Sequence, residues 1–411
     1  MNCRHCGTPL THVFADLATA PPSNAFLTAE DLRTMERYYP LRVFVCDACW
    51  LVQTEDYTGA DELFSSEYVY FSAFSDTWLD HCRRYASDII QRFGLDNQSL
   101  VVEIAANDGC LLERFKESGI PCYGVEPTRS TAEAARKRGI DIVEEFFSVE
   151  LGERLAAEGR QADLTAANNV LAHVPAINDF VGGFGRLLNP HGVATFEFPH
   201  LLELVAHAQF DTIYHEHYSY LSLTTVNRIL AASGLAVFDV ETLMTHGGSL
   251  RVYAQPANTG THPVSQNVTE VLRAEHDAGL TSLSYYQGFQ TRIDGIKNDF
   301  LRFLLDARRD GRKVAAYGAA AKGNTLINYS GVRNDLLAYV VDRNPSKQGK
   351  YLPGSRIPVV DEAHLQADRP DYVVILPWNL TDEITGQLAY FREWGGRFVR
   401  SVPKLSEQAQ K

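Results

Sequence analysis

The segment Val101-Val-Glu-Ile-Ala-Ala-Asn-Asp-Gly109 decides the fold of this 411-residue chain. It starts as a short apolar run and ends in small and polar residues, and the amphipathic stretch CLLERFKESG (110–119) follows directly. A strand, a tight turn and a helix in this order form the first half of a βαβ unit. In such a unit the turn lies at the carboxyl end of the strand and lets the backbone approach a ligand.

The alternation of apolar strands and helices extends outward from this segment. It runs from about residue 77 to residue 256, and a second series of the same kind begins near residue 311. Strands that alternate with helices of about 10–15 residues indicate parallel sheets. The last two apolar runs of the first series, 236–243 and 249–256, are adjacent and predict an antiparallel hairpin at one sheet edge.

Domain boundaries are expected where this alternation stops and resumes. The N-terminal residues contain short β-like runs such as Leu41–Val45 and little helical periodicity. A break rich in Gly, Pro and Thr at 257–264 precedes a long helix predicted over 280–309. We therefore predict an α/β protein of three domains: a small N-terminal module (1–75), a Rossmann-like domain (76–256) and a second Rossmann-like domain (311–411), with a linker and long helix at 257–310.

Composition narrows the class of protein. Hydrophobic residues make up 45% of the chain and charged residues 22%, which is typical of a globular enzyme. The net charge of −13 argues against general nucleic-acid binding, which needs a basic surface. No apolar run approaches the roughly 20 residues that cross a bilayer, and the N-terminus has no secretion signal. We expect a cytoplasmic, monomeric enzyme that binds neither nucleic acid nor membranes.

Four of the seven cysteines form two close pairs, Cys3-x-x-Cys6 and Cys46-x-x-Cys49. Two intervening residues let both thiolates of a pair reach one zinc ion at about 2.3 Å. Paired cysteines in a cytosolic chain indicate metal rather than disulfides. Four thiolates close a tetrahedral shell, so we predict a structural zinc site in the N-terminal module.

The residues around the 101–109 turn predict a site for S-adenosylmethionine. The turn is expected to approach the methionyl part of the cofactor, and a nearby acid is expected to bind the ammonium group of that part. Glu126 ends the next strand, where a carboxylate can accept hydrogen bonds from both ribose hydroxyls. The absence of GxGxxG disfavours a nicotinamide cofactor, while Ala105 and Ala106 replace an expected glycine. The predicted cofactor residues are Glu103, Asn107, Asp108, Gly109, Glu126, Asn168 and Asn169.

A cluster of titratable residues, Tyr214-His-Glu-His-Tyr218, follows the fifth strand of the first series. That connection and His173, after the fourth strand, should lie at the carboxyl edge of the sheet, where ligands bind. The His-x-His spacing does not match the i, i+4 pattern of helical zinc proteases. A histidine near neutral pKa removes a proton next to a carbonyl, and a tyrosine or second histidine stabilises the enolate. The predicted catalytic residues are His217, Tyr214, Glu216 and His173.

The C-terminal series offers groups for an anionic substrate. Gly318-Ala-Ala-Ala-Lys-Gly-Asn324 opens a helix, and a helix N-terminus with a nearby lysine favours phosphate. The HGGSLR turn at 246–251 is a second anion-capable element, and the aromatic segment before residue 76 is expected to close over the site. The predicted substrate contacts are Tyr68, Tyr70, Ser72, Ser249, Arg251, Lys322, Asn324, Arg343 and Lys347.

The ordered set of motifs resembles the sugar C-methyltransferase family, typified by C-3′-methyltransferases that act on thymidine-diphosphate keto-deoxysugars in antibiotic pathways. The matching motifs run nearly end to end: PPSNAF, YPLRVFVCDACWLVQ, YVYFS, VEIAANDG, NNVLAHV, FEFPH, YHEHYSYLS, HGGSLR, YGAAAKGN, VDRNPSKQGKYLPGSRIPV and PWN. The resemblance implies a zinc module, a methyltransferase domain and a C-terminal domain that helps to hold the nucleotide sugar. It implies deprotonation at C-3 beside a C-4 ketone and methyl transfer to that carbon. It also implies His217 or Tyr214 as base or enolate stabiliser, Glu216 and His173 as supporting residues, and Tyr68 as a sugar contact.

Three other functions remain open at this point. The first is a zinc-containing methyltransferase that acts on RNA, protein or another small molecule. The acidic net charge argues against RNA and protein as its substrates. A nucleotide-sugar epimerase or dehydrogenase would bind NAD in the C-terminal domain, but GAAAKG lacks the middle glycine of the dinucleotide motif. A non-catalytic scaffold would tolerate loss of the His217 imidazole.

Overall fold

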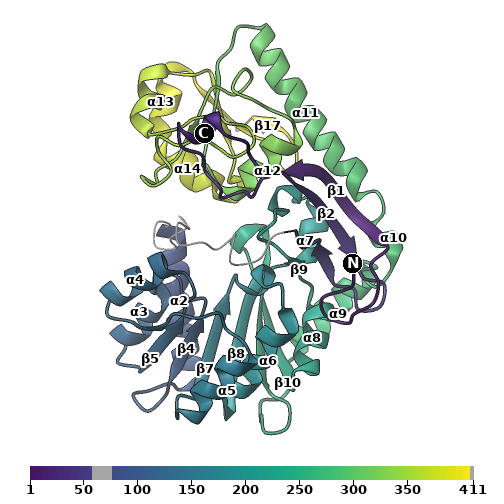
Figure 1. Cartoon of the computed structure of the whole chain (residues 1–411), viewed down its shortest axis with the longest axis vertical. Coiled ribbons are helices and arrows are strands. Elements are labelled where there is room, and N and C mark those ends of the chain that lie inside the picture. The colour runs from purple at the N-terminus through teal and green to yellow at the C-terminus, as the bar shows by residue number, and fades with distance from the viewer. Residues whose placement is uncertain (58–75, 408–411) are drawn as a thin grey trace.

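Three β-sheets organise the chain, as the computed structural model shows for residues 1–57 and 76–407 (Figure 1). The N-terminal residues form a four-stranded sheet in the order β1-β2-β3-β9, in which neighbours are antiparallel. Its elements are β1 (His12–Ala20), η1 (Asp31–Arg33), β2 (Tyr39–Val45), β3 (Val52–Thr54) and β9 (Ser219–Tyr220). Strand β9 comes from the middle domain, so this sheet joins the N-terminal module to the next domain.

The middle domain is built on a seven-stranded sheet in the order β10-β11-β8-β7-β4-β5-β6. Strand β11 lies antiparallel between β10 and β8, and the remaining neighbours are parallel. Its elements are α2 (Asp76–Phe93), β4 (Val101–Ile104), α3 (Cys110–Glu117), β5 (Cys122–Val125), α4 (Arg129–Lys137), β6 (Asp141–Val143), α5 (Val149–Ala157), β7 (Ala162–Asn168), η3 (Leu171–His173), α6 (Ile177–Leu187), β8 (Leu188–Pro199), α7 (Leu201–Ala206), η4 (Phe210–Thr212), α8 (Leu223–Ala232), β10 (Leu235–Leu243), η5 (Thr245–Gly247), β11 (Ser249–Pro256) and α9 (Gln266–Asp277).

The C-terminal domain holds a six-stranded sheet in the order β14-β13-β12-β15-β16-β17, parallel except for β17. Its elements, with the two helices that precede it, are α10 (Leu283–Tyr286), α11 (Phe289–Arg309), β12 (Val314–Tyr317), α12 (Ala321–Tyr329), β13 (Val340–Val341), β14 (Val359–Val360), α13 (Glu362–Asp368), β15 (Tyr372–Ile375), η6 (Trp378–Leu380), α14 (Thr381–Gln387), η7 (Ala389–Trp394), β16 (Arg397–Arg400) and β17 (Ser406–Glu407). No helix in the described ranges is both long and apolar enough to span a bilayer.

The α/β class and the hairpin at the sheet edge are confirmed, whereas the long helix needs correction. Gly288 has φ +81°, so α11 begins at Phe289 and α10 is a separate single turn. The sequence interpretation also passed over α9. This helix packs against the middle domain, where its buried Glu275 accepts hydrogen bonds from the backbone N–H groups of Leu223 and Thr224. Residues 257–310 therefore include a helix that completes the middle domain.

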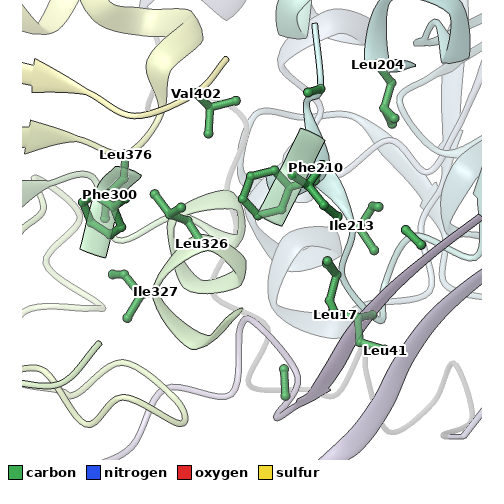
Figure 2. Packing of buried hydrophobic residues seen from close by; sticks show 14 of the residues in the cluster. Leu17, Leu41, Leu204, Phe210, Ile213, Phe300, Leu326, Ile327, Leu376 and Val402 are labelled. Carbon is green, nitrogen blue, oxygen red and sulfur yellow. The ribbon is translucent and has the colours of Figure 1, made fainter. Parts of the chain in front are cut away.

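One hydrophobic cluster connects all three domains (Figure 2). Leu17 and Leu41 of the N-terminal strands face Phe210 and Ile213 of the middle domain in this cluster. Side chains of the C-terminal domain and α11 occupy its other side: Phe300, Leu326, Ile327, Leu376 and Val402. Figure 1 shows β1 running alongside α11, between the upper and lower parts of the molecule. The shared core fixes how the C-terminal domain sits over the carboxyl edge of the middle sheet.

Candidate functional site

The four predicted zinc ligands lie together in the N-terminal module. Their sulfur atoms are all within 4.8 Å of one another, and the Cys3–Cys49 and Cys6–Cys46 sulfurs are 3.5 Å apart. Tetrahedral zinc with Zn–S bonds of 2.3 Å places sulfurs about 3.8 Å apart, so the cluster has the right size. The donor set and its geometry fit a zinc ion.

The two cysteine pairs share the same backbone turn. The N–H of Gly7 donates to the carbonyl oxygen of Cys3 at 2.9 Å, and the N–H of Trp50 donates to that of Cys46 at the same distance. Gly7 and Trp50 both have positive φ, +75° and +66°. A left-handed residue after each pair turns both sulfurs toward one point, a conformation that glycine adopts at little cost and tryptophan rarely does.

The turn after β4 has an unusual backbone that the sequence did not reveal. Ala105, Asn107 and Gly109 all have positive φ, at +60°, +48° and +74°. Alanine in this region is strained, and such strain collects where a backbone must approach a ligand. Gly124 on the neighbouring strand accommodates the turn, because a Cβ there would lie 2.6 Å from that of Ala106. The turn keeps its tight form although alanines replace the expected glycine.

Glu126 fixes this turn from the end of β5. Its Oε2 accepts a hydrogen bond from the backbone N–H of Asn107 at 2.8 Å, and its Oε1 accepts one from the N–H of Thr128 at 2.9 Å. Burial raises the pKa of Glu126, and these two hydrogen bonds oppose that shift. A carboxylate has about four lone-pair positions, so it retains capacity for hydroxyl donors.

A cavity lies over the carboxyl ends of β4, β5 and β7. Of the predicted cofactor residues, Asn107, Glu126, Asn168 and Asn169 line it. Glu103 and Asp108 are buried beneath the turn, and burial raises the pKa of Glu103 well above its ordinary value. Gly109 caps α3. The remaining lining residues are Trp78, Ile104, Ala105, Val125, Pro127, Thr128, Phe146, Phe147, Val170, His173, Val174, Pro175, Phe180 and His246.

Asn168 presents a buried amide to this cavity. Neither its Oδ1 nor its Nδ2 has a hydrogen-bond partner among the described residues. Asn169, next to it, has φ +56°, and its N–H donates to the carbonyl oxygen of Glu197 at 2.7 Å. An unpartnered amide in a closed site costs free energy unless a ligand pairs with it. Asn168 is therefore available to a bound molecule.

Tyr214 and His217 form a hydrogen-bonded pair. The Nδ1 of His217 lies 2.7 Å from the carbonyl oxygen of Thr212, which only accepts, so Nδ1 carries the proton. The phenol of Tyr214 then donates to Nε2 of His217 at 2.8 Å. Burial, helped by nearby His173, lowers the pKa of His217 well below its ordinary value. The pair holds a neutral imidazole whose Nε2 accepts protons.

His173 joins this pair to the cavity. Its ring centroid is 4.6 Å from that of His217, and its Nδ1–H donates to the carbonyl oxygen of Glu216 at 2.8 Å. Burial lowers the pKa of His173 to about 4. Because His173 lines the cavity, the proton-accepting pair lies directly behind the cavity wall.

Glu216 faces the N-terminal module. Asn24 donates from Nδ2 to Oε1 of Glu216 at 3.1 Å, while Oε2 of Glu216 has no partner among the described residues. Burial raises the pKa of Glu216. The N-terminal module thus fixes one residue of the predicted catalytic cluster.

Lys322 reaches the same region from the C-terminal domain. Its Nζ donates to Oδ1 of Asn379 at 3.2 Å and lies 4.6 Å from the ring centroid of Trp378. The indole N–H of Trp378 donates to Oδ2 of Asp211 at 2.6 Å. Burial raises the pKa of Asp211 to about 6, although the charge of Lys322 opposes the shift. Lys322 is thereby held over the ring of Trp378 at the start of α12.

The other predicted substrate contacts have different surroundings. Ser249 donates to the carbonyl oxygen of Thr245, and Arg251 pairs with the buried Glu197 at 3.0 Å. Asn324 donates to the carbonyl oxygen of Ser23 at 2.8 Å. Lys347 donates to the carbonyl oxygen of Ala319 at 2.8 Å, and Arg343 is exposed. Asn324 thus joins the C-terminal domain to the N-terminal module, whereas Ser249, Arg251 and Lys347 hold contacts within their own domains. Tyr68, Tyr70 and Ser72 lie outside the described residues.

Sequence reasoning missed several residues of the site. Trp78, Phe146 and His246 line the cavity, and Asp211 and Trp378 hold Lys322 in place. His246 belongs to the HGGSLR turn, which the sequence predicted to bind an anion. Burial lowers the pKa of His246 to about 4. The PWN motif was a signal for Trp378, but nothing local to the sequence indicates which residue it contacts.

Comparison with known proteins identifies the family. A family model described as a methyltransferase domain matches residues 78–240, one described as a C-methyltransferase C-terminal domain matches 244–403, and one for a domain inferred to bind zinc matches 3–64. The C-methyltransferase NovU of Streptomyces niveus is 35% identical over 402 residues, which cover 98% of this chain and 95% of the relative.

Two solved structures match part of the chain at low similarity. Magnesium protoporphyrin IX methyltransferase from Synechocystis PCC 6803, solved with bound SAH, is 14% identical with a TM-score of 0.35 and covers 43% of this chain and 82% of its own. The PH0226 protein from Pyrococcus horikoshii OT3 is 13% identical with a TM-score of 0.38, covering 46% and 95%. Because this chain is similar to NovU along nearly the whole length of both proteins, it belongs to the C-methyltransferase family and is a SAM-dependent methyltransferase.

Proposed function

We propose that this enzyme methylates C-3, beside a C-4 ketone, of a nucleotide-linked deoxysugar, with thymidine diphosphate as the expected carrier, in branched-sugar biosynthesis. S-adenosylmethionine supplies an electrophilic methyl group. The observation that carries the proposal is the Tyr214–His217 pair, in which a neutral Nε2 accepts the phenol hydrogen at 2.8 Å behind the wall of the cavity. A base in this position suits removal of a proton next to a carbonyl.

The cavity residues have separate roles in this proposal. Glu126 and the unpartnered amide of Asn168 bind the cofactor at the carboxyl edge of the sheet. The pair formed by Tyr214 and His217 receives the substrate proton, and His173 separates it from the cofactor. The C-terminal domain closes the site from above and contacts the nucleotide sugar, for which the exposed Arg343 is available.

The zinc ion has a structural role in this proposal. Four thiolates would leave no open coordination position for a substrate, and the cluster lies in a module that contacts residues 214–220 through strand pairing, hydrogen bonds and ring contacts. In this proposal the protein groups that take part in the reaction are the imidazole of His217 and the phenol of Tyr214.

The test uses the purified enzyme with S-adenosylmethionine and a panel of nucleotide-linked 4-keto-6-deoxyhexoses. NMR in D₂O reports exchange at both carbons next to the ketone, and product analysis reports the methylated carbon. We expect exchange and methylation at C-3. Exchange at C-5 alone would correct the position, and methyl transfer only to RNA or to an unrelated small molecule would overturn the substrate class.

His217→Asn tests the base. We expect methyl transfer to fall by about 100-fold or more while S-adenosylmethionine and nucleotide still bind. His191→Asn, at an exposed histidine of β8, is the matched control and should retain turnover. Near-normal turnover of His217→Asn would remove His217 from the mechanism.

A further inference from the structure

The ammonium of Lys322 belongs to a half-buried side chain, and its protein neighbours neutralise it only in part. An ammonium has three donors, and the single hydrogen bond that the described residues give it is to Asn379. Within residues 1–57 and 76–407 no carboxylate forms an ion pair with Lys322: Asp211 acts on it from a distance and accepts the indole N–H of Trp378 instead. A charge that is partly removed from water and has no ion-pair partner is stabilised by an anion, so the position favours a bound anion.

The attachments of α12 direct this cation toward the histidines. Thr325, one turn after Lys322, donates from Oγ1 to the carbonyl oxygen of Ile213 at 2.9 Å, directly before Tyr214. The ring of Trp378, which lies under Lys322, packs so closely on Gly247 that a Cβ there would come within 2.3 Å of it. Gly247 follows His246, which lines the cofactor cavity. Lys322 therefore stands between the Tyr214 segment and the His246 turn.

Electrostatics agree with this placement. After burial, which is the largest cause, the charge of Lys322 lowers the pKa of both His217 and His246. Lys347, the other lysine near the start of α12, is engaged with the carbonyl oxygen of Ala319. An anion that forms beside His217 would thus meet the ammonium of Lys322.

We propose that Lys322 stabilises the enolate oxygen formed during methyl transfer, with Trp378 and Asn379 as positioning residues. The inference rests on the proposed function and assigns a role to a group outside the Tyr214–His217 pair. The C–H bond next to the ketone breaks, its proton passes to the pair, and its electrons leave a negative charge on the carbonyl oxygen. Lys322 donates a hydrogen bond to that oxygen. The same electrons then form the new C–C bond to the methyl group, the methyl–sulfur bond breaks with its pair remaining on sulfur, and the carbonyl is restored.

The pyrophosphate of the substrate is a second anion of suitable chemistry, and the experiment separates the two. The variant is Lys322→Met, which replaces a half-buried charge by a side chain of similar length and should keep the fold. Lys404→Met, at an exposed lysine of the same domain, is the matched control. Asn379→Ala removes the oxygen that holds the ammonium without removing the charge.

Two measurements are made on each protein. The first is the rate of deuterium incorporation next to the ketone of a saturating thymidine-diphosphate 4-keto-6-deoxyhexose in D₂O, with S-adenosylhomocysteine in the cofactor site. The second is the affinity for thymidine diphosphate. We expect exchange to slow by about 100-fold in Lys322→Met, the loss typical of removing one oxyanion donor, while nucleotide affinity stays within about twofold. Asn379→Ala should slow exchange less, and Lys404→Met should match the wild type.

Each outcome has a distinct meaning. Unchanged exchange in Lys322→Met overturns the inference, and so does a loss of nucleotide affinity as large as the loss of exchange, which would assign Lys322 to the pyrophosphate. If Lys322→Met does not fold, unchanged exchange in Asn379→Ala overturns it. If the wild type incorporates deuterium into no keto-sugar, the proposed function itself is wrong. This result is visible before any variant is compared.

Discussion

At the scale of single residues, backbone oxygens determine how the site histidines are protonated. His217 and His173 each donate Nδ1–H to a carbonyl oxygen, of Thr212 and Glu216. This interaction leaves Nε2 as the acceptor in both rings and orients them toward each other. Burial keeps both rings neutral, which suits a proton acceptor at physiological pH.

The lowered pKa of His217 predicts the pH dependence of turnover. Burial is its main cause, and the neighbouring His173, Lys322 and His246 add to it. Since the neutral imidazole is the active form, kcat should stay level as pH falls from 8 to 6.5 and decline only below the ordinary histidine pKa. A pH profile of kcat measured at saturating substrates checks this. An acid limb centred at or above pH 6.5 would contradict the assignment of His217 as the proton acceptor.

Asn168→Leu should separate cofactor binding from stability. Because the amide has no partner among the described residues, its loss should leave the free energy of unfolding unchanged or slightly higher. The Kd for S-adenosylmethionine should rise by about tenfold, as expected for one lost hydrogen bond. Calorimetric titration and thermal unfolding without ligand provide the two readouts.

Asn189→Leu is the contrasting control for this pair of measurements. Asn189 donates to Asp163 at 2.8 Å, so its replacement should lower stability and leave cofactor affinity unchanged. An unaltered S-adenosylmethionine affinity in Asn168→Leu would show that this amide does not face the cofactor.

At the scale of elements, the site is assembled where short segments of different domains meet. η5 of the middle domain contacts η6 of the C-terminal domain, and η4 contacts α12. Gly247 in η5 allows the closest of these approaches, because its missing side chain leaves room for the ring of Trp378. The position of Lys322 above Trp378 depends on that contact.

Gly247→Ala tests this contact against a control of equal backbone strain. Gly247 and Gly288 have similar φ values, +88° and +81°, but an added Cβ meets Trp378 only at Gly247, and at Gly288 it meets nothing within 4 Å. Gly247→Ala should therefore cost about 1–3 kcal/mol more in unfolding free energy than Gly288→Ala and should also reduce kcat. Equal losses in denaturant titrations of the two variants would rule out tight packing of the η5 turn on Trp378.

At the scale of the whole molecule, the N-terminal module joins the other two domains. Strand β3 pairs with β9, which directly follows the catalytic segment 214–218. The loop after β1 contacts the C-terminal domain, where Asn324 donates to Ser23, and Asn24 contacts Glu216 of the middle domain. The cluster of Figure 2 contains side chains of all three domains. Damage to the module should therefore spread to the active site.

Zinc removal should act through this connection. Cys46→Ser, or chelation of the wild type, should lower Tm by about 5 °C, roughly 4 kcal/mol for a protein of this size, and reduce turnover. The pH profile of the remaining activity should not move, because no chemical step of the proposed mechanism uses the metal. Cys122→Ser, at a cysteine outside the cluster, is the control for loss of a thiol. A zinc-free, fully stable and active Cys46→Ser enzyme would contradict the structural role.

Much of the fold could be predicted because it depends on local patterns. The apolar runs at 101–104 and 162–168 became strands β4 and β7, and the adjacent runs near the end of the series became the hairpin of β10 and β11. The long helix was misjudged at Gly288, where a left-handed residue ends one helical turn and starts another. Helix α9 was overlooked because it follows the Gly- and Pro-rich break that suggested a linker.

Local patterns were enough to predict the cysteine cluster and the strand, turn and helix around 101–109, because each depends on spacing within a few residues or on alternation along the chain. Tertiary contacts alone decide that Asn324 and Lys347 donate to backbone carbonyl oxygens while Lys322 lies over the ring of Trp378. Lys322 and Asn324 follow β12 and Lys347 follows β13, and no local pattern distinguishes their roles. The contacts that distinguish these residues come from Trp378, Asp211 and Ser23. Those three residues are far apart in the sequence, and the contacts form only when the three domains share one core.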